Sequence, residues 1–179
     1  MKRKSGTVHI TVGAMLAALS IIIPQIFHFT GIPQAGSVFL PMHIPVLLSG
    51  FILGPVYGVI IGAVSPAVSF LITDMPTAER LPFMIAELAF YGLISGLFFH
   101  TLNFKAKKFG TVSTLLISML CGRLAYALML FCASEFFGIE CGGAMAAVTA
   151  TVTGIYGIIL QLVTIPPVVY ALKRSEFIK

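Results

Sequence analysis

Six apolar stretches divide this chain, and short polar or Gly/Pro-rich breaks separate them. Runs of about 20 apolar residues are typical of helices that cross a bilayer. The third stretch is shorter than the others and contains Pro66, so we expect it to be kinked or incomplete. The six candidate spans cover approximately residues 8–29, 38–53, 59–73, 81–102, 111–137 and 144–172.

The composition supports a membrane protein. Of the 179 residues, 58% are hydrophobic and only 9% are charged, whereas an ordinary soluble domain carries about 25% charged residues. So few charges cannot cover a globule of this size with polar surface, which excludes a soluble domain. We therefore predict an all-α integral membrane protein, a bundle of six transmembrane helices that forms a single membrane domain over residues 1–179.

Basic residues fall mainly on one side of such a bundle. If the N-terminus lies inside, only Arg80 falls in an outer loop, and Arg123 lies within a span. Because cytoplasmic loops carry an excess of Lys and Arg, we predict that both termini are cytoplasmic. The other nine of the eleven basic residues are then on the inner side: Lys2, Arg3, Lys4, Lys105, Lys107, Lys108, Lys173, Arg174 and Lys179.

Small residues recur at four-residue spacing in several spans. Ala14 and Ala18 share one face of the first span, and glycine pairs occupy the second, third and fourth spans. Such faces let helix backbones approach closely. They indicate either packing within this chain or a docking face for another membrane subunit. The pair in the first span suits docking best because that helix opens the chain.

Ionisable residues within membrane spans are costly and are candidates for function. Glu87 lies six residues into the fourth span, roughly 9 Å below its outer end. Arg123 lies about twelve residues into the fifth span, roughly 18 Å above its inner end. Both side chains therefore reach the outer half of the bundle. Two interpretations remain open: an ion pair that locks the two helices together, or a pocket open to the outside in which Arg123 receives an anionic group.

Four further polar residues lie at suitable depths for such a pocket. His43 is near the outer end of the second span, and Tyr126 is about one turn outward of Arg123. Gln161 lies deeper in the sixth span, with Tyr156 one to two turns outward of it. For His43 the alternative is an ordinary helix-end histidine, and for the tyrosines it is packing or membrane-interface placement.

Catalytic and metal-binding patterns are missing from the sequence. Ser95 lacks the glycine two residues before it that a nucleophile elbow requires, and no HExxH or Walker motif occurs. The cysteines Cys121, Cys132 and Cys141 have no metal-binding spacing. We therefore predict that the chain is not an enzyme, holds no metal or cofactor, and does not itself hydrolyse ATP.

Several motifs resemble the substrate-binding S components of energy-coupling factor (ECF) vitamin transporters. The stretch LPMHIPVLLSGFILGPVYG at residues 40–58 carries this resemblance most specifically. The resemblance extends over essentially the whole chain, and within the family it is closest to the subgroup with pantothenate-type S components. The other matching stretches are Ser65–Pro66 with TDMP at 73–76, ELAFYG at 87–92, Gly122–Arg123, and ILQL at 159–162 with Pro166.

The resemblance implies a function. It implies a multi-pass subunit of the bacterial cell membrane that binds a small, pantothenate-like vitamin from outside, with Ala14 and Ala18 matching the family's docking motif. The implied partners are a membrane coupling subunit and two cytoplasmic ATPases, which use the ATP. Alternatives are an S component for folate or cobalamin, an intramembrane enzyme, or a channel or scaffold protein whose small-residue faces are homo-oligomer seams.

Overall fold

The computed structural model describes residues 6–29, 35–107, 109–137, 143–175 and 177, and this part of the chain is helical without strands. Six of its helices are long and apolar enough to cross a membrane, which confirms the predicted fold class. The predicted inner residues Lys2, Arg3, Lys4, Lys108 and Lys179, and also Cys141, lie outside the described residues.

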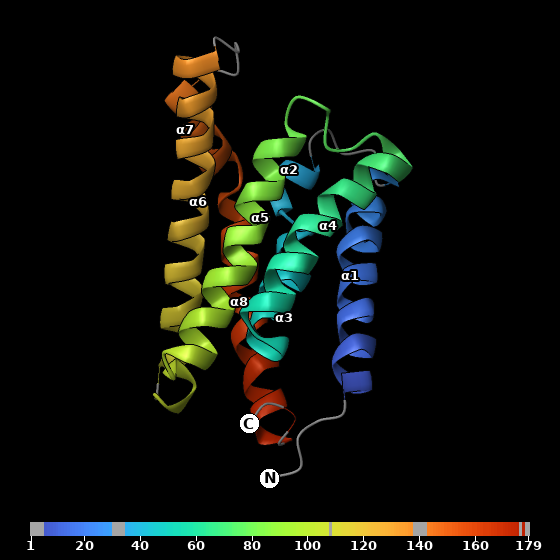
Figure 1. Ribbon diagram of the computed structural model, residues 1–179, viewed down its shortest axis with the longest axis vertical. Coiled ribbons are helices and arrows are strands. Elements are labelled where there is room, and N and C mark those ends of the chain that lie inside the picture. Colours follow the sequence, from blue (N-terminus) through green and yellow to red (C-terminus); the bar gives the residue numbers. More distant parts are fainter. Residues whose placement is uncertain (1–5, 30–34, 108, 138–142, 176, 178–179) are drawn as a thin grey trace.

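The chain runs up and down through the bundle (Figure 1). The short helix α2 follows α1 and packs against it. Helices α3 and α4 form a pair joined at Gly54. The start of α1 and the end of α8 lie at one end of the bundle, and the α4–α5 connection lies at the other. The helices are α1 (Gly6–Phe29), α2 (Ala35–Phe39), α3 (His43–Leu53), α4 (Pro55–Thr73), α5 (Leu81–Gly96), α6 (Gly110–Phe137), α7 (Gly143–Thr153) and α8 (Ile155–Arg174).

Two of the expected spans are interrupted. The second is divided into α2 and α3 at residues 40–42, where Leu40 has a left-handed φ of 48°. Pro41 follows, and it has no N–H to continue a helix. The sixth expected span, 144–172, is divided at Gly154, so that the spanning helix is α8 alone. The third is more complete than expected, because α4 begins at Pro55 and continues through Pro66.

Helix α5 is the centre of the bundle and packs against α3, α4 and α6. Its Leu88 and Tyr91 are almost fully buried, together with Phe51 of α3 and Phe99 in the π-helical turn Leu97–Thr101 that follows α5. The rings of Phe51 and Phe99 meet edge to face at 4.9 Å. This packing fixes α5 between its neighbours and holds Glu87 in the interior.

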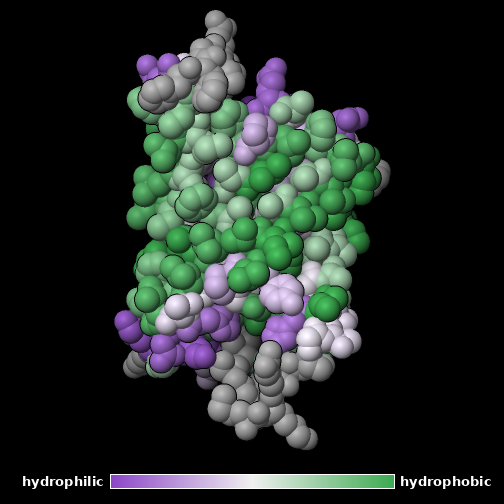
Figure 2. Space-filling model, viewed as in Figure 1, coloured by the Kyte–Doolittle hydropathy of each residue, from purple (hydrophilic) through white to green (hydrophobic). Residues whose placement is uncertain are grey.

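The outer surface is apolar over the middle of the molecule. Figure 2 shows hydrophobic residues in a broad band, with hydrophilic residues gathered at the two ends. Large apolar side chains such as Leu71, Leu120 and Val163 are well exposed in this structure. The hydrocarbon core of a bilayer, about 30 Å thick, covers such a band. In water, exposure of so much apolar surface would be unfavourable.

Candidate functional site

A cavity of about 910 Å³ opens at the end of the bundle that holds the α4–α5 connection. Its walls come from α2, the start of α3, the α4–α5 connection, α5, α6 and α7, with single residues from α1 and α4. Its ionisable lining residues, including the phenol of Tyr126, are His43, Glu79, Arg80, Glu87, Arg123 and Tyr126. Four of the six residues that the sequence singled out for ligand binding therefore line one cavity.

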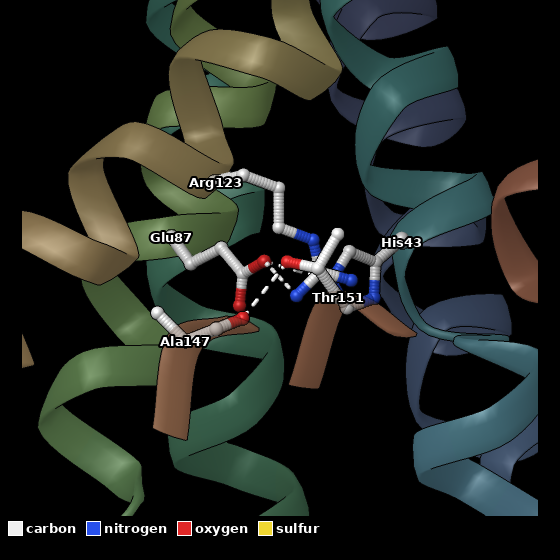
Figure 3. Close-up of polar contacts among 5 residues, drawn as sticks. All are labelled: His43, Glu87, Arg123, Ala147 and Thr151. Atoms are coloured by element: carbon white, nitrogen blue, oxygen red, sulfur yellow. Dashed lines mark hydrogen bonds and ion pairs between the residues drawn. The ribbon is translucent and has the colours of Figure 1, made fainter. Parts of the chain in front are cut away.

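Glu87 and Arg123 form an ion pair across α5 and α6 (Figure 3). Arg123 Nη1 lies 3.1 Å from Glu87 Oε1, and the two side chains are only 13% and 5% exposed. Helix α5 begins at Leu81 with Pro82 in its first turn, where a missing N–H costs nothing. This start places Glu87 between one and two turns below the mouth of the cavity.

His43 approaches the same carboxylate from α3. Its Nε2 lies 3.7 Å from Glu87 Oε1, and the histidine is 2% exposed. That separation exceeds hydrogen-bond length. Tyr91, one turn along α5 from Glu87, packs edge-on against the His43 ring, with the ring centres 5.1 Å apart. The break at residues 40–42 makes His43 the first residue of α3 and turns it toward this cluster.

Several buried nitrogen atoms of this cluster have no hydrogen-bond partner among the described residues. They are Arg123 Nε and Nη2 and both ring nitrogens of His43; Glu87 Oε1 is held by the ion pair with Arg123 Nη1. Because an unsatisfied buried polar group costs about 1–3 kcal/mol, such atoms are rare in proteins and call for a partner. Arg123, which lines the cavity, therefore has hydrogen-bond donors that no described residue uses, and a guanidinium is a group that binds anions.

The α7–α8 break leaves room for the guanidinium. A Cβ atom at Gly154 would lie 3.0 Å from Arg123 Nη2 and 2.9 Å from the Leu40 side chain. Any larger residue there would press on the arginine. Thr151, which overlaps the cluster in Figure 3, donates its hydroxyl to the Ala147 carbonyl at 2.9 Å within α7.

The remaining two predicted site residues lie elsewhere. Tyr156 is 64% exposed at the start of α8, and Gln161 is 1% exposed in the interior. Neither lines the cavity. The side-chain amide of Gln161 has no hydrogen-bond partner among the described residues.

Sequence reasoning missed two features of the cavity. Tyr91 was not singled out, although its four-residue spacing from Glu87 places both on one face of a helix. Glu79 and Arg80 line the mouth from the α4–α5 connection, where the sequence indicated only an outer loop. In the part of the chain that the structure describes, no group of three or more His, Cys, Asp or Glu side chains is placed to hold a metal.

A second surface involves the first helix. Ala14 and Ala18 are both exposed on α1. Ala14 lines a shallow apolar groove of about 260 Å³ between α1 and α4, with Gly13, Ala17 and Tyr57 among its other walls. The small side chains leave the α1 backbone accessible to another helix.

Comparison with known proteins identifies the family. Residues 8–169 match the family described as "ECF transporter, substrate-specific component". Neither the search of curated proteins nor the search of solved structures found a match. The match covers most of the chain, so the protein belongs to the substrate-specific (S) components of ECF transporters, which are multi-pass binding subunits of membrane transporters and not enzymes.

Proposed function

We propose that this S component captures a small, carboxylate-bearing vitamin of the pantothenate type from the outer side of the cell membrane. The observation that carries the proposal is the guanidinium of Arg123, a residue that lines a large cavity and whose buried Nε and Nη2 have no hydrogen-bond partner among the described residues. The planar fork of arginine donates two parallel hydrogen bonds to a carboxylate. A neutral vitamin would leave that capacity unused.

Glu87 has a role in the same proposal. Before the ligand binds, Glu87 neutralises Arg123 through the 3.1 Å ion pair. A ligand carboxylate then shares or replaces Glu87 at the guanidinium, and Glu87 accepts hydrogen bonds from ligand hydroxyl groups. We assign His43 and Tyr126 as further ligand contacts because they line the cavity. Tyr156 and Gln161 have no part in this proposal.

The size of the cavity supports a small vitamin. Ligand pockets for drug-sized molecules occupy about 300–1,000 Å³, and this cavity of about 910 Å³ includes its open mouth. Pantothenate fits comfortably within that volume. Folate also carries carboxylates and satisfies the same charge reasoning, whereas the corrin ring system of cobalamin is far bulkier.

Energy for transport comes from partners. S components pair with an energy-coupling module, in which ATPases use the ATP. We propose that the module consists of a membrane coupling subunit with two cytoplasmic ATPases, and that the α1 face with Ala14 and Ala18 docks on the coupling subunit.

The decisive experiment measures the dissociation constant for pantothenate in detergent, with folate and cobalamin as competitors. Hydrogen bonds to charged groups contribute about 1.5–3 kcal/mol, and each 1.4 kcal/mol is a tenfold change in affinity. We therefore expect Arg123→Ala to weaken binding about ten- to a hundredfold or more. Arg123→Lys should also lose most of the affinity, because it keeps the charge but loses the fork.

The matched control is Arg174→Ala, which removes an exposed arginine at the opposite end of the bundle. It should bind like the wild type, and all variants should be monodisperse. If both Arg123 variants bind pantothenate with wild-type affinity, Arg123 serves only as a structural ion-pair partner and the case for an anionic vitamin fails.

A further inference from the structure

The charges buried in the cavity balance only while no anion is bound. Arg123 contributes one positive charge and Glu87 one negative charge, and both are largely removed from solvent. His43 is the third ionisable group of this buried cluster, and its Nε2 lies 3.7 Å from the Glu87 oxygen that Arg123 also contacts. With His43 neutral, the cluster is neutral overall.

The other titratable groups that face this cluster do not change its net charge. From α5, Tyr91 contacts the His43 ring and contributes a neutral phenol. From α6, Tyr126 lines the cavity. From the α4–α5 connection, Glu79 and Arg80 line the mouth, where they are solvent-exposed and of opposite sign. No further charged side chain lines the cavity among the described residues.

A ligand carboxylate at Arg123 would give the buried cluster a net charge of −1. An uncompensated buried charge is expensive, and a protein site relieves it by changing a protonation state. His43 is the group best placed to supply the missing positive charge. Both ring nitrogens of His43 lack a hydrogen-bond partner among the described residues, and a small approach would give Nε2 a charge-assisted bond to Glu87.

We infer that His43 takes up one proton from solvent when the anionic vitamin binds, and thereby makes the site specific for an acid over its neutral analogue. The proton adds to a free ring nitrogen of His43, and no other bond is made or broken. The site thus binds the vitamin anion and a proton together, as a neutral pair. This inference rests on the proposed function, because it requires a carboxylate beside Arg123.

Isothermal titration calorimetry with pantothenate tests the inference. Titrations of the purified protein in buffers of different ionisation enthalpy report the number of protons taken up per ligand. We expect about one proton per bound ligand near pH 7.5, because one added positive charge restores the neutrality of the buried cluster. Affinity should fall as the pH rises above this value, by up to about tenfold per pH unit, because binding is linked to one proton.

Two variants locate the proton. In His43→Gln the proton uptake should vanish, and binding should become weaker and independent of pH between 6.5 and 8.5. In Glu87→Gln the uptake should also vanish, because Arg123 alone then balances the ligand. The matched control is His9→Gln, a histidine of α1 that stacks on Tyr57 away from the cavity. It should take up as many protons per ligand as the wild type.

Panthenol, in which an alcohol replaces the carboxylate of pantothenate, should bind weakly and without proton uptake.

The outcomes separate this inference from the proposed function. Pantothenate binding with no proton uptake by the wild type would overturn the inference and leave the proposed function intact. Uptake that persists in His43→Gln would assign the proton to another group, and full uptake in Glu87→Gln would refute the charge balance; either result overturns the inference. Failure of the wild type to bind any carboxylate-bearing vitamin would overturn the proposed function itself.

Discussion

At the scale of single residues, glycine decides how closely α4 and α5 can pack. A Cβ atom on Gly92 would overlap the backbone of Gly58, and a Cβ atom on Gly58 would overlap the backbone of Gly92. Gly62 meets the backbone of Leu88 in the same way. These glycines belong to the four-residue spacings that the sequence shows, and their role is packing within the chain. Direct backbone contact at this crossing is typical of membrane helices.

The variant Gly92→Ala should therefore destabilise the protein. Alanine is the better helix former, so any loss must come from steric overlap, which costs about 1–3 kcal/mol in a packed interior. The measurement is the thermal midpoint of the detergent-purified protein, which should fall. The control is Gly6→Ala, where an added Cβ meets nothing within 4 Å. Equal midpoints for the two variants would mean that α4 and α5 do not cross this closely.

At the scale of helices, α1 presents two kinds of face. The buried Leu16 and Ser20 pack inward, and Ser20 hydrogen-bonds to Ser65 of α4 at 2.5 Å. Ala14 and Ala18 remain exposed, unlike the glycines of α4 and α5. Their small side chains allow close approach of another helix, as the proposed docking on the coupling subunit requires.

Replacement of both alanines by phenylalanine should abolish vitamin uptake by the complete transporter. The bulky rings would keep the backbone of α1 away from the coupling subunit, while pantothenate binding to the isolated S component should survive because neither alanine lines the cavity. The measurements are uptake by cells and binding in detergent. Leu120→Phe, at a 62% exposed position of α6, is the control for added bulk. Wild-type uptake by the double variant would show that this face is not a docking surface.

The sequence predicted how deep each residue lies along its helix better than it predicted the direction in which the side chain points. Counting residues from opposite ends brought Glu87 and Arg123 to similar depths, and the structure pairs them at 3.1 Å. The same counting gave Tyr156 a suitable depth, but the direction of its side chain depends on the break at Gly154. Gly154 lies close to Leu40 and Arg123, and hydrophobic periodicity does not encode such tertiary packing. Tyr156 consequently lies 64% exposed on the surface.

At the scale of the whole molecule, the bundle has a basic end and a cavity end. The Lys173 ammonium donates to the Lys105 carbonyl at 2.9 Å and lies 4.7 Å from the centre of the Phe99 ring. These contacts tie the end of α8 to the connection between α5 and α6. The described Lys105, Lys107, Lys173 and Arg174 thus gather at the end where α1 starts, opposite the mouth of the cavity. This is the charge asymmetry that predicts sidedness.

The last prediction is the orientation in the membrane, with the basic end and both termini in the cytoplasm and the cavity facing outward. Thr77 and Lys107 are exposed at opposite ends of the bundle, so each suits a single cysteine in a background without Cys121, Cys132 and Cys141. A membrane-impermeant maleimide added to intact cells should label Thr77→Cys and not Lys107→Cys, because the positive-inside rule predicts that Lys107 is cytoplasmic. Permeabilised cells provide the control, since both positions should then react. Labelling of Lys107→Cys alone in intact cells would show the opposite orientation, and labelling of both cysteines would contradict the predicted topology.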